Sequence, residues 1–248
     1  FEEDPVRSLR AIRFSNKLGF KLDNQVKDAI YDKGHLLADI SNARLFDEFC
    51  KIFLNGMAEK NFLKLCSFKL NRHLILSDPN KSDFSNNVMI QALRNTDDRV
   101  KNDQSITPGF LMAALLWPTL LAKCSKNGEI NIRKFFRSMD GVLREQQKLT
   151  AVPRKFSSYI KDIWVLQLKL HSRIASQPYK TLRHPRFRAA YDFLLVREKA
   201  AGDKNGLGKW WTDFQKDDDS LRGTIIANMN EKNEEESSKI FGFYNELR

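Results

Sequence analysis

The chain has 248 residues, of which 42% are hydrophobic and 29% charged, and its formal net charge is +11. This length supports one large or two modest domains with real cores, and an excess of Lys and Arg indicates a polyanionic partner. The longest apolar run, Phe110 to Trp117, is too short to cross a bilayer and excludes stable membrane insertion.

The first predicted helix begins at Asp4 and Pro5. An Asp side chain can cap free N–H groups, and a proline at the first helical position needs no hydrogen-bond donor. Gly19 predicts the end of this helix, because glycine adopts the left-handed conformation common at helix C-termini. Two faces are expected, an apolar one formed by Val6, Leu9, Ile12 and Leu18 and a basic stripe formed by Arg7, Arg10, Arg13 and Lys17.

Asp4 and Arg7 share the first turn of this helix. A carboxylate offers only acceptors and a guanidinium only donors. Together they complement a base edge with an amino group beside a ring nitrogen, which both adenine and cytosine present. The alternative is that Asp4 only caps the helix while Arg7 pairs with a neighbouring carboxylate.

The middle of the chain predicts five further helices. A helix starts after Asp23 and ends at Gly34, and another starts at Ser41 or Asn42 and ends at Asn55. In the latter helix Arg44 and Glu48 are spaced to pair along the surface. A helix over 57–70, a loop over 78–83 and a helix ending in the charged Asp97-Asp98 pair follow. The most apolar helix then runs from Phe110 to Leu121, with an interruption and a kink expected at Pro118.

The last third of the chain remains helical and becomes basic. From Arg133 to Lys199 there are sixteen Lys or Arg against five Asp or Glu. This surplus favours a face that follows the phosphates of a polyanion, although a solvated surface can also be rich in lysine. We interpret Trp164 and Phe193 as core aromatics rather than base-stacking platforms. One of Trp210 and Trp211 is expected to dock on the bundle.

The fold class predicted from these patterns is all-α, a multi-helix bundle. The three cysteines, Cys50, Cys66 and Cys124, contain no Cys-x-x-Cys pair, which is typical of buried thiols in a reducing cytoplasm. No two histidines have metal-ligand spacing, so no metal site is expected in this chain.

Two motifs resemble the neck of the class II nucleotidyltransferases, which include bacterial tRNA CCA-adding enzymes and poly(A) polymerases. They are Glu3-Asp4-Pro5-Val6-Arg7 and Ile40-Ser41-Asn42-Ala43-Arg44-Leu45-Phe46-Asp47-Glu48. The resemblance implies that Asp4 and Arg7 contact the incoming ATP base and that Arg44 supports their helix. It also implies support of the neck by Glu3, Arg10 and Glu48.

Later stretches resemble the bacterial poly(A) polymerase branch of this family, at 95–110, 162–168, 184–192 and 209–215. The implied domains are a neck at 1–60, a body at 61–130, a basic RNA-binding domain at 131–215 and an acidic, flexible tail at 216–248. The acidic tail departs from the arginine-rich end that is common in the family. The residues expected to bind RNA are Arg154, Lys155, Lys161, Arg183, Arg186 and Arg188.

The resemblance implies a portion of a cytoplasmic polynucleotide adenylyltransferase that adds AMP from ATP to RNA 3′ ends without a template. In the family, carboxylates on a head N-terminal to the neck hold Mg²⁺. This chain alone is therefore expected to bind no Mg²⁺ and to be inactive. The expected partners are RNA 3′ ends, ATP and RNA-decay proteins. The alternatives are a tRNA CCA-adding enzyme and a non-catalytic helical RNA-binding module.

Overall fold

A computed structural model of the chain describes residues 1–76, 83–126, 129–173, 176–202 and 206–216. Within these residues the β structure consists of one antiparallel pair of two-residue strands, and all other regular elements are helices. The predicted all-α class is confirmed. The elements are α1 (Val6–Leu18), α2 (Asn24–Lys33), η1 (Gly34–Asp39), α3 (Asn42–Phe53), α4 (Ala58–Ser67), η2 (Asn71–His73), α5 (Asp83–Lys101), α6 (Pro108–Cys124), β1 (Ser125–Lys126), β2 (Glu129–Ile130), α7 (Ile132–Gln147), α8 (Arg154–Leu170), α9 (Gln177–Leu182), α10 (Phe187–Ala201) and α11 (Leu207–Lys216).

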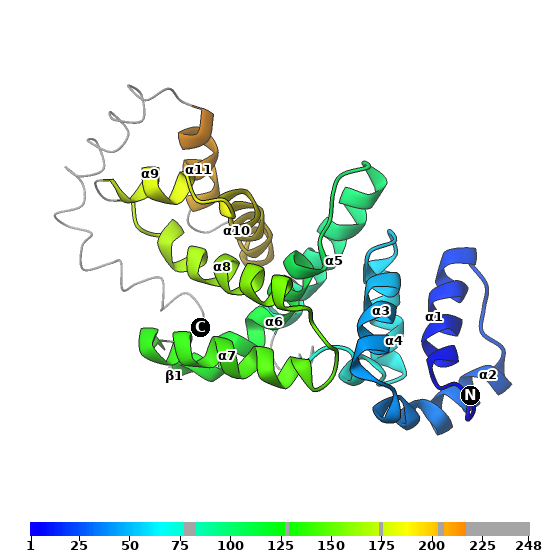
Figure 1. The fold of residues 1–248 in the computed structure, drawn as a ribbon. Coiled ribbons are helices and arrows are strands. Elements are labelled where there is room, and N and C mark those ends of the chain that lie inside the picture. The colour runs from blue at the N-terminus through cyan, green and yellow to red at the C-terminus, as the bar shows by residue number, and fades with distance from the viewer. Residues whose placement is uncertain (77–82, 127–128, 174–175, 203–205, 217–248) are drawn as a thin grey trace.

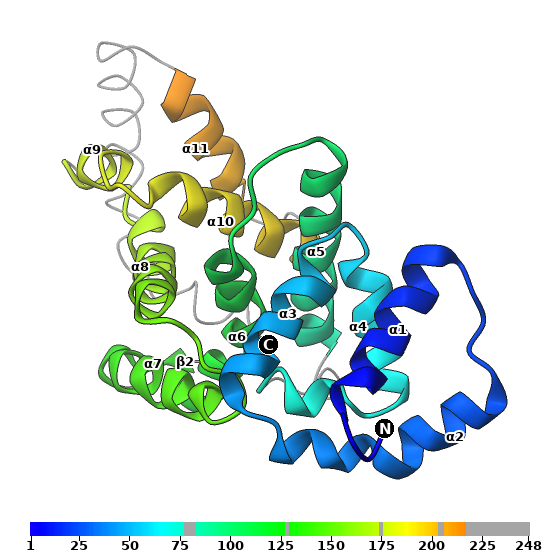
Figure 2. The same ribbon diagram turned by 45° about the vertical axis from the view of Figure 1, so that its right-hand side comes forward.

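The helices form two groups that meet at α5 and α6 (Figures 1 and 2). In the first group α1 packs against α3 and α4, and α4 packs against α5. In the second group α7 and α8 pack on α6, and α10 packs on α5, α8 and α11. The segment before α8 lies against the start of α3, because the Ala151 N–H donates to the Asn42 carbonyl oxygen at 2.9 Å.

Helix α6 occupies the centre of the core because it is apolar on all sides. It runs without a break from Pro108 to Cys124 and includes Pro118, which is buried. The interruption predicted at Pro118 is therefore wrong. Burial of the surrounding helix stabilises it by more than the single backbone hydrogen bond that a proline removes.

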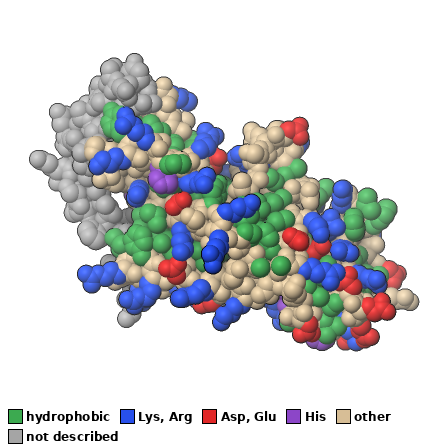
Figure 3. Space-filling model, viewed as in Figure 1, with side chains coloured by type: hydrophobic (Ala, Val, Ile, Leu, Met, Phe, Trp, Pro, Cys, Tyr) green, Lys and Arg blue, Asp and Glu red, His purple; other side chains and the backbone are tan. Residues whose placement is uncertain are grey.

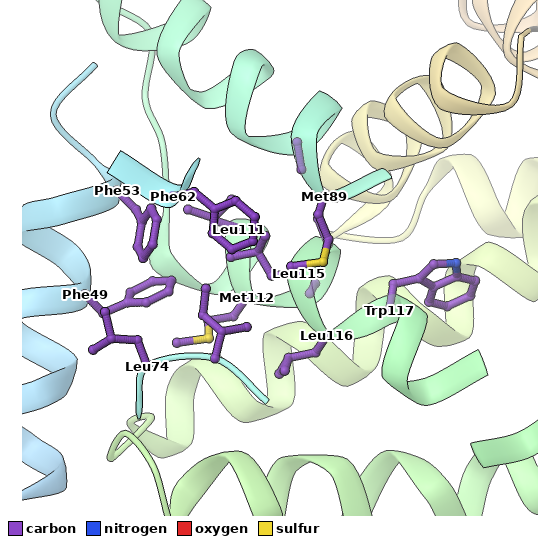
Figure 4. Packing of buried hydrophobic residues seen from close by; sticks show 14 of the residues in the cluster. Phe49, Phe53, Phe62, Leu74, Met89, Leu111, Met112, Leu115, Leu116 and Trp117 are labelled. Carbon is purple, nitrogen blue, oxygen red and sulfur yellow. The ribbon is translucent and has the colours of Figure 1, made fainter. Parts of the chain in front are cut away.

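One hydrophobic cluster extends from α1 to α10. Figure 4 shows Phe49 and Phe53 of α3 and Phe62 of α4 directed toward the side chains of α6, with Trp117 on the opposite side. Each of these four rings is at most 1% exposed. This cluster crosses positions 60 and 130, and the four-domain division stays a prediction.

A second cluster joins α8, α10 and α11. The Trp211 Nε1 donates to the Leu170 carbonyl oxygen at 2.9 Å, so the expected docking of one tryptophan is confirmed. Trp164 and Phe193 are fully buried, as predicted for core aromatics. The predicted flexible tail lies outside the described residues from 217 onward.

Candidate nucleic-acid interface

The first turn of α1 carries Asp4 and Arg7. Asp4 Oδ1 accepts a hydrogen bond from the Val6 backbone N–H at 3.3 Å. Pro5 has φ −57° and ψ −24°, the helical torsion angles expected for a proline in a first turn. The sequence therefore sets the helix start as predicted, with the Asp4 carboxylate on the Val6 N–H.

Arg44 fixes the Asp4 carboxylate from the start of α3. Arg44 Nη2 donates to Asp4 Oδ1 at 2.8 Å, and the Asp4 side chain is only 19% exposed. The Ser41 hydroxyl caps α3 by accepting from the Arg44 N–H at 3.4 Å. Within the described part of the chain, the recorded bonds of the Asp4 carboxylate all use Oδ1. Its Oδ2 therefore retains the capacity to accept a hydrogen bond from a ligand.

A second ionic contact joins α1 to α3 through Glu48. Arg10 Nη2 lies 3.5 Å from Glu48 Oε1, and Lys51 Nζ lies 3.0 Å from the same oxygen. Glu48 is 1% exposed, so two cations compensate a carboxylate that would otherwise be costly to bury. The surface pair that the spacing of Arg44 and Glu48 allows does not form, because Glu48 contacts Arg10 and Lys51 while Arg44 reaches Asp4.

Arg7, in contrast, projects into solvent. Its Nη1 lies 4.0 Å from Glu3 Oε2, and the two side chains are 59% and 89% exposed. Such a long, solvated ion pair is weak. Glu3, expected to support the neck, thus has its recorded ion pair with Arg7 and is largely exposed. The donors of Arg7 remain accessible to a ligand beside Asp4.

The end of α1 differs from its expected burial. Val6, Leu9 and Ile12 are buried, whereas Leu18 is 55% exposed, so the prediction for Leu18 is wrong. The last recorded bonds of α1 with α4 are polar, among them that from Asn16 to Asn61 at 2.8 Å. Leu18 follows these contacts at the solvent-facing end of the helix.

The basic residues expected to bind RNA lie around α8 and α9. Arg154 and Lys155 are exposed in the first turn of α8, and Arg183 is exposed at the end of α9. Lys161 is half-buried and its Nζ contacts Asp140 Oδ1 of α7 at 2.5 Å, so its charge is already compensated. Figure 3 shows Lys and Arg side chains over the α7–α8 side, whereas acidic and basic groups alternate over α1 and α2.

Arg186 and Arg188 come together at the start of α10, on the wall of a cavity. Arg188 Nε contacts Asp192 Oδ1 at 3.1 Å, and Arg99 Nη1 of α5 contacts Asp192 Oδ2 at 3.2 Å. Sequence reasoning missed Arg99 and Asp192. The spacing of Arg188 and Asp192 along α10 was a local signal, but nothing local connects Asp192 to a residue 93 positions earlier.

The described residues contain no group of three His, Cys, Asp or Glu that could hold a metal ion. Burial raises the pKa of the Cys50 and Cys124 thiols to about 11, so both are neutral and unreactive near pH 7. None of the described helices has the length and apolar content that a membrane crossing requires.

Two family models match the chain. One, described as "Probable RNA and SrmB-binding site of polymerase A", matches residues 19–79, and the other, "Polymerase A arginine-rich C-terminus", matches residues 127–240. The first match includes α3 with Arg44 and Glu48. The second covers all six residues expected to bind RNA.

Curated relatives agree with these matches. The chain is 35% identical to poly(A) polymerase I of Escherichia coli O157:H7 over 226 residues, which are 87% of this chain and 49% of that protein. It is 34% identical to poly(A) polymerase I of Haemophilus influenzae over 236 residues, or 91% of this chain and 52% of that protein. The CCA-adding enzyme of Lactococcus lactis is 30% identical over 207 residues, or 84% of this chain and 46% of that enzyme.

The chain thus spans about half the length of the curated relatives it matches. These two poly(A) polymerases match it at higher identity and over more residues than the CCA-adding enzyme of Lactococcus lactis does. With an all-α fold and matches to both family models, the chain belongs to the bacterial poly(A) polymerase family.

Proposed function

We propose that the chain is the base-selecting and RNA-binding portion of a polynucleotide adenylyltransferase that adds AMP from ATP to RNA 3′ ends without a template. The observation that carries this proposal is the arrangement at the start of α1. Arg44 holds one oxygen of Asp4, the other oxygen retains its acceptor capacity, and Arg7 is exposed one helical turn away.

The chemistry of this pair fits adenine. The N6 amino group would donate to Asp4 Oδ2, and the N1 ring nitrogen would accept from the Arg7 guanidinium. Guanine and uracil present a carbonyl oxygen where Asp4 needs a donor, so the carboxylate would reject both. Cytosine offers the same pattern as adenine, which keeps a CCA-adding activity as the second candidate. Choice between ATP and CTP then needs a further contact, such as a fit to purine size.

RNA would bind at the other group of helices. Arg154, Lys155 and Arg183 are exposed there and provide charge for the phosphates. Arg186 and Arg188 extend this surface to the start of α10. Lys161 contributes less, because Asp140 already compensates its charge.

The remaining parts of the proposal concern the complete enzyme. We assign Mg²⁺ and the catalytic carboxylates to the head that the family resemblance implies N-terminal to the neck. Base selection would belong to the neck, and RNA binding to the basic domain that follows the body. We further propose that the enzyme is located in the cytoplasm and that it associates with RNA-decay proteins in mRNA processing.

The test is a tailing assay on the complete gene product with labelled single-stranded RNA, Mg²⁺ and one nucleotide at a time. The expected result is long tails with ATP and little incorporation of GTP or UTP. The 248-residue chain, assayed in parallel, should bind RNA without extending it. Tailing by this chain alone would contradict the assignment of the catalytic carboxylates.

Two outcomes would favour the other functions. Addition of only C, C and A to a tRNA that lacks its terminal CCA would identify a CCA-adding enzyme. RNA binding without any incorporation by the complete gene product would identify a non-catalytic RNA-binding module.

A further inference from the structure

A cavity of about 220 Å³ opens between the end of α5, the start of α6, the middle of α8 and the start of α10. Its wall includes side chains from segments far apart in the sequence. Those that matter here are Arg99, Phe110, Tyr159, Arg186, Arg188 and Asp192.

The lining carries three arginines and one carboxylate, which leaves an excess of two positive charges. Asp192 is 12% exposed and is held by Arg99 on one oxygen and by Arg188 on the other. Among the described residues, Arg186 has no carboxylate partner. The guanidinium carbon of Arg186 instead lies 5.0 Å from the centroid of the Tyr159 ring. The cavity therefore has its single acidic group neutralised and a third cation in its wall.

Two long helices begin at this cavity. Thr107, which caps α6 by accepting from the Phe110 N–H at 3.2 Å, and Arg186, which precedes α10, both line it. Helix N-termini carry partial positive charge. These dipoles add to the three guanidinium groups, so the cavity favours an anion.

The aromatic part of the wall is held in place. Phe110 and Tyr159 line it, and Tyr159 lies against Gly109 so closely that a Cβ at position 109 would be 2.8 Å from the Tyr159 ring. The glycine thus permits the ring to pack on the first turn of α6. A site that combines fixed aromatic rings with guanidinium groups suits a nucleotide better than a simple anion.

We propose that this cavity binds one internal phosphodiester of single-stranded RNA, with the adjoining base against the wall formed by Tyr159 and Arg186. The inference rests on the proposed RNA-binding function and assigns one nucleotide of the RNA to a defined place. Arg186 and the helix starts would hold the phosphate. Arg99 and Arg188 would position the site through Asp192 and add to its charge.

The test compares Arg186→Gln with Arg144→Gln in the 248-residue chain. Arg144 is an exposed arginine of α7 that does not line the cavity, so both variants lose one charge. The probe is a fluorescein-labelled oligoadenylate, and its Kd is measured by anisotropy over a range of salt concentrations. Arg186→Gln should weaken binding about tenfold, as expected for a lost hydrogen bond to a charged group. It should also lower the salt slope by about 0.7, the value for one phosphate of a single strand.

A second arm replaces one phosphate of the oligoadenylate at a time with an uncharged methylphosphonate. At one internal position the replacement should weaken binding to the unmodified chain but not to Arg186→Gln. Arg186→Lys, which keeps the charge, should restore part of the affinity. Thermal unfolding followed by circular dichroism verifies that each variant is folded.

The outcomes separate this inference from the function on which it rests. If RNA binds and both glutamine variants lose the same affinity, the cavity is not a phosphate site, while RNA binding stands. Methylphosphonate effects that persist unchanged in Arg186→Gln would also overturn the inference. A chain that does not bind the oligoadenylate at all would refute both proposals. If Arg186→Gln weakened the binding of polyglutamate and left the affinity for oligoadenylate unchanged, the cavity would be assigned to an acidic protein.

Discussion

Substitution of Arg44 by Met tests whether the contact between α1 and α3 holds the proposed base-selecting carboxylate. Methionine keeps much of the aliphatic length of the side chain and removes the guanidinium. The Asp4 carboxylate then loses its 2.8 Å partner, while the Val6 N–H contact at 3.3 Å remains. The start of α1 should become less well ordered.

The magnitude follows from the burial of the two partners. Exposed ion pairs contribute up to about 1 kcal/mol, and breaking a fully buried pair costs about 3–5 kcal/mol. Arg44 is 44% exposed and Asp4 19%, so the pair is close to the exposed limit. We expect Arg44→Met to lower the free energy of unfolding by about 1 kcal/mol.

The assay is urea unfolding of four proteins: the unmodified chain, Arg44→Met, Asp4→Asn and the double variant. The coupling energy should be about 1 kcal/mol, because each single variant removes the same contact. The matched control is Arg7→Met, which should leave the unfolding midpoint unchanged. The guanidinium that it removes lies 4.0 Å from the Glu3 carboxylate in an exposed, weak ion pair.

A coupling energy within the additivity error of about 0.3–0.5 kcal/mol would show that Arg44 does not brace Asp4. A loss of stability in Arg7→Met as large as that in Arg44→Met would refute the distinction drawn between the two arginines. Arg44 would then have no better claim than Arg7 to a supporting role.

Three further predictions concern stability. Gly109→Ala should destabilise the chain by about 1–3 kcal/mol, because the added Cβ would press on Tyr159. Gly141→Ala, where the added Cβ meets nothing within 4 Å, should instead stabilise α7 by about 0.5–1 kcal/mol. Changes of the same sign in the free energy of unfolding of the two variants, measured in urea, would contradict this. Burial lowers the pKa of His171 from 6.5 to about 3, so the unfolded chain binds more protons than the folded chain below pH 6.5. The free energy of unfolding should therefore fall by about 1.4 kcal/mol per pH unit as the pH drops below 6.5. His171→Gln should reduce this dependence on pH, and an identical dependence in the variant would refute the role of His171. Asp97→Ala should cost about 1–2 kcal/mol, because Asp97 accepts from the first two N–H groups of α4; no shift in the melting temperature would exclude this cap.

Local patterns determined which helices could be predicted from the sequence. Asp4, Pro5 and Gly19 mark the two ends of α1, and Ser41 marks the start of α3, because capping and turn chemistry act over a few residues. The continuous apolar sequence of α6 predicted its burial. Pro118 misled the prediction because tertiary packing outweighs one missing backbone bond.

Contacts between distant segments could not be predicted in the same way. Arg44 and Glu48 have the spacing of a surface pair, yet each pairs with a residue of α1. Only the resemblance to a family suggested a supporting role for Arg44. Asp97 looked like part of a charged helix end, and its bonds to α4 depend on how α5 packs.

For the candidate RNA surface, too, some features could be predicted from the sequence and others could not. Composition located the basic stretch, and the exposed positions of Arg154 and Arg186 agree with it. Composition could not predict that Asp140 pairs with Lys161. Nor could it predict the cavity, whose walls come from four helices.

The most direct test of base selection compares ATP with ITP in the complete gene product. Inosine replaces the N6 amino group of adenine with a carbonyl oxygen, which the Asp4 carboxylate cannot bind. The unmodified protein should prefer ATP by about 10- to 100-fold in kcat/KM, the value of a good base contact. In Asp4→Asn the amide can donate to that oxygen, so the preference should fall; the part due to Arg7 remains, because N1 of inosine carries a proton and cannot accept from the guanidinium. An unchanged ATP-to-ITP ratio in a folded Asp4→Asn protein would contradict the role of Asp4.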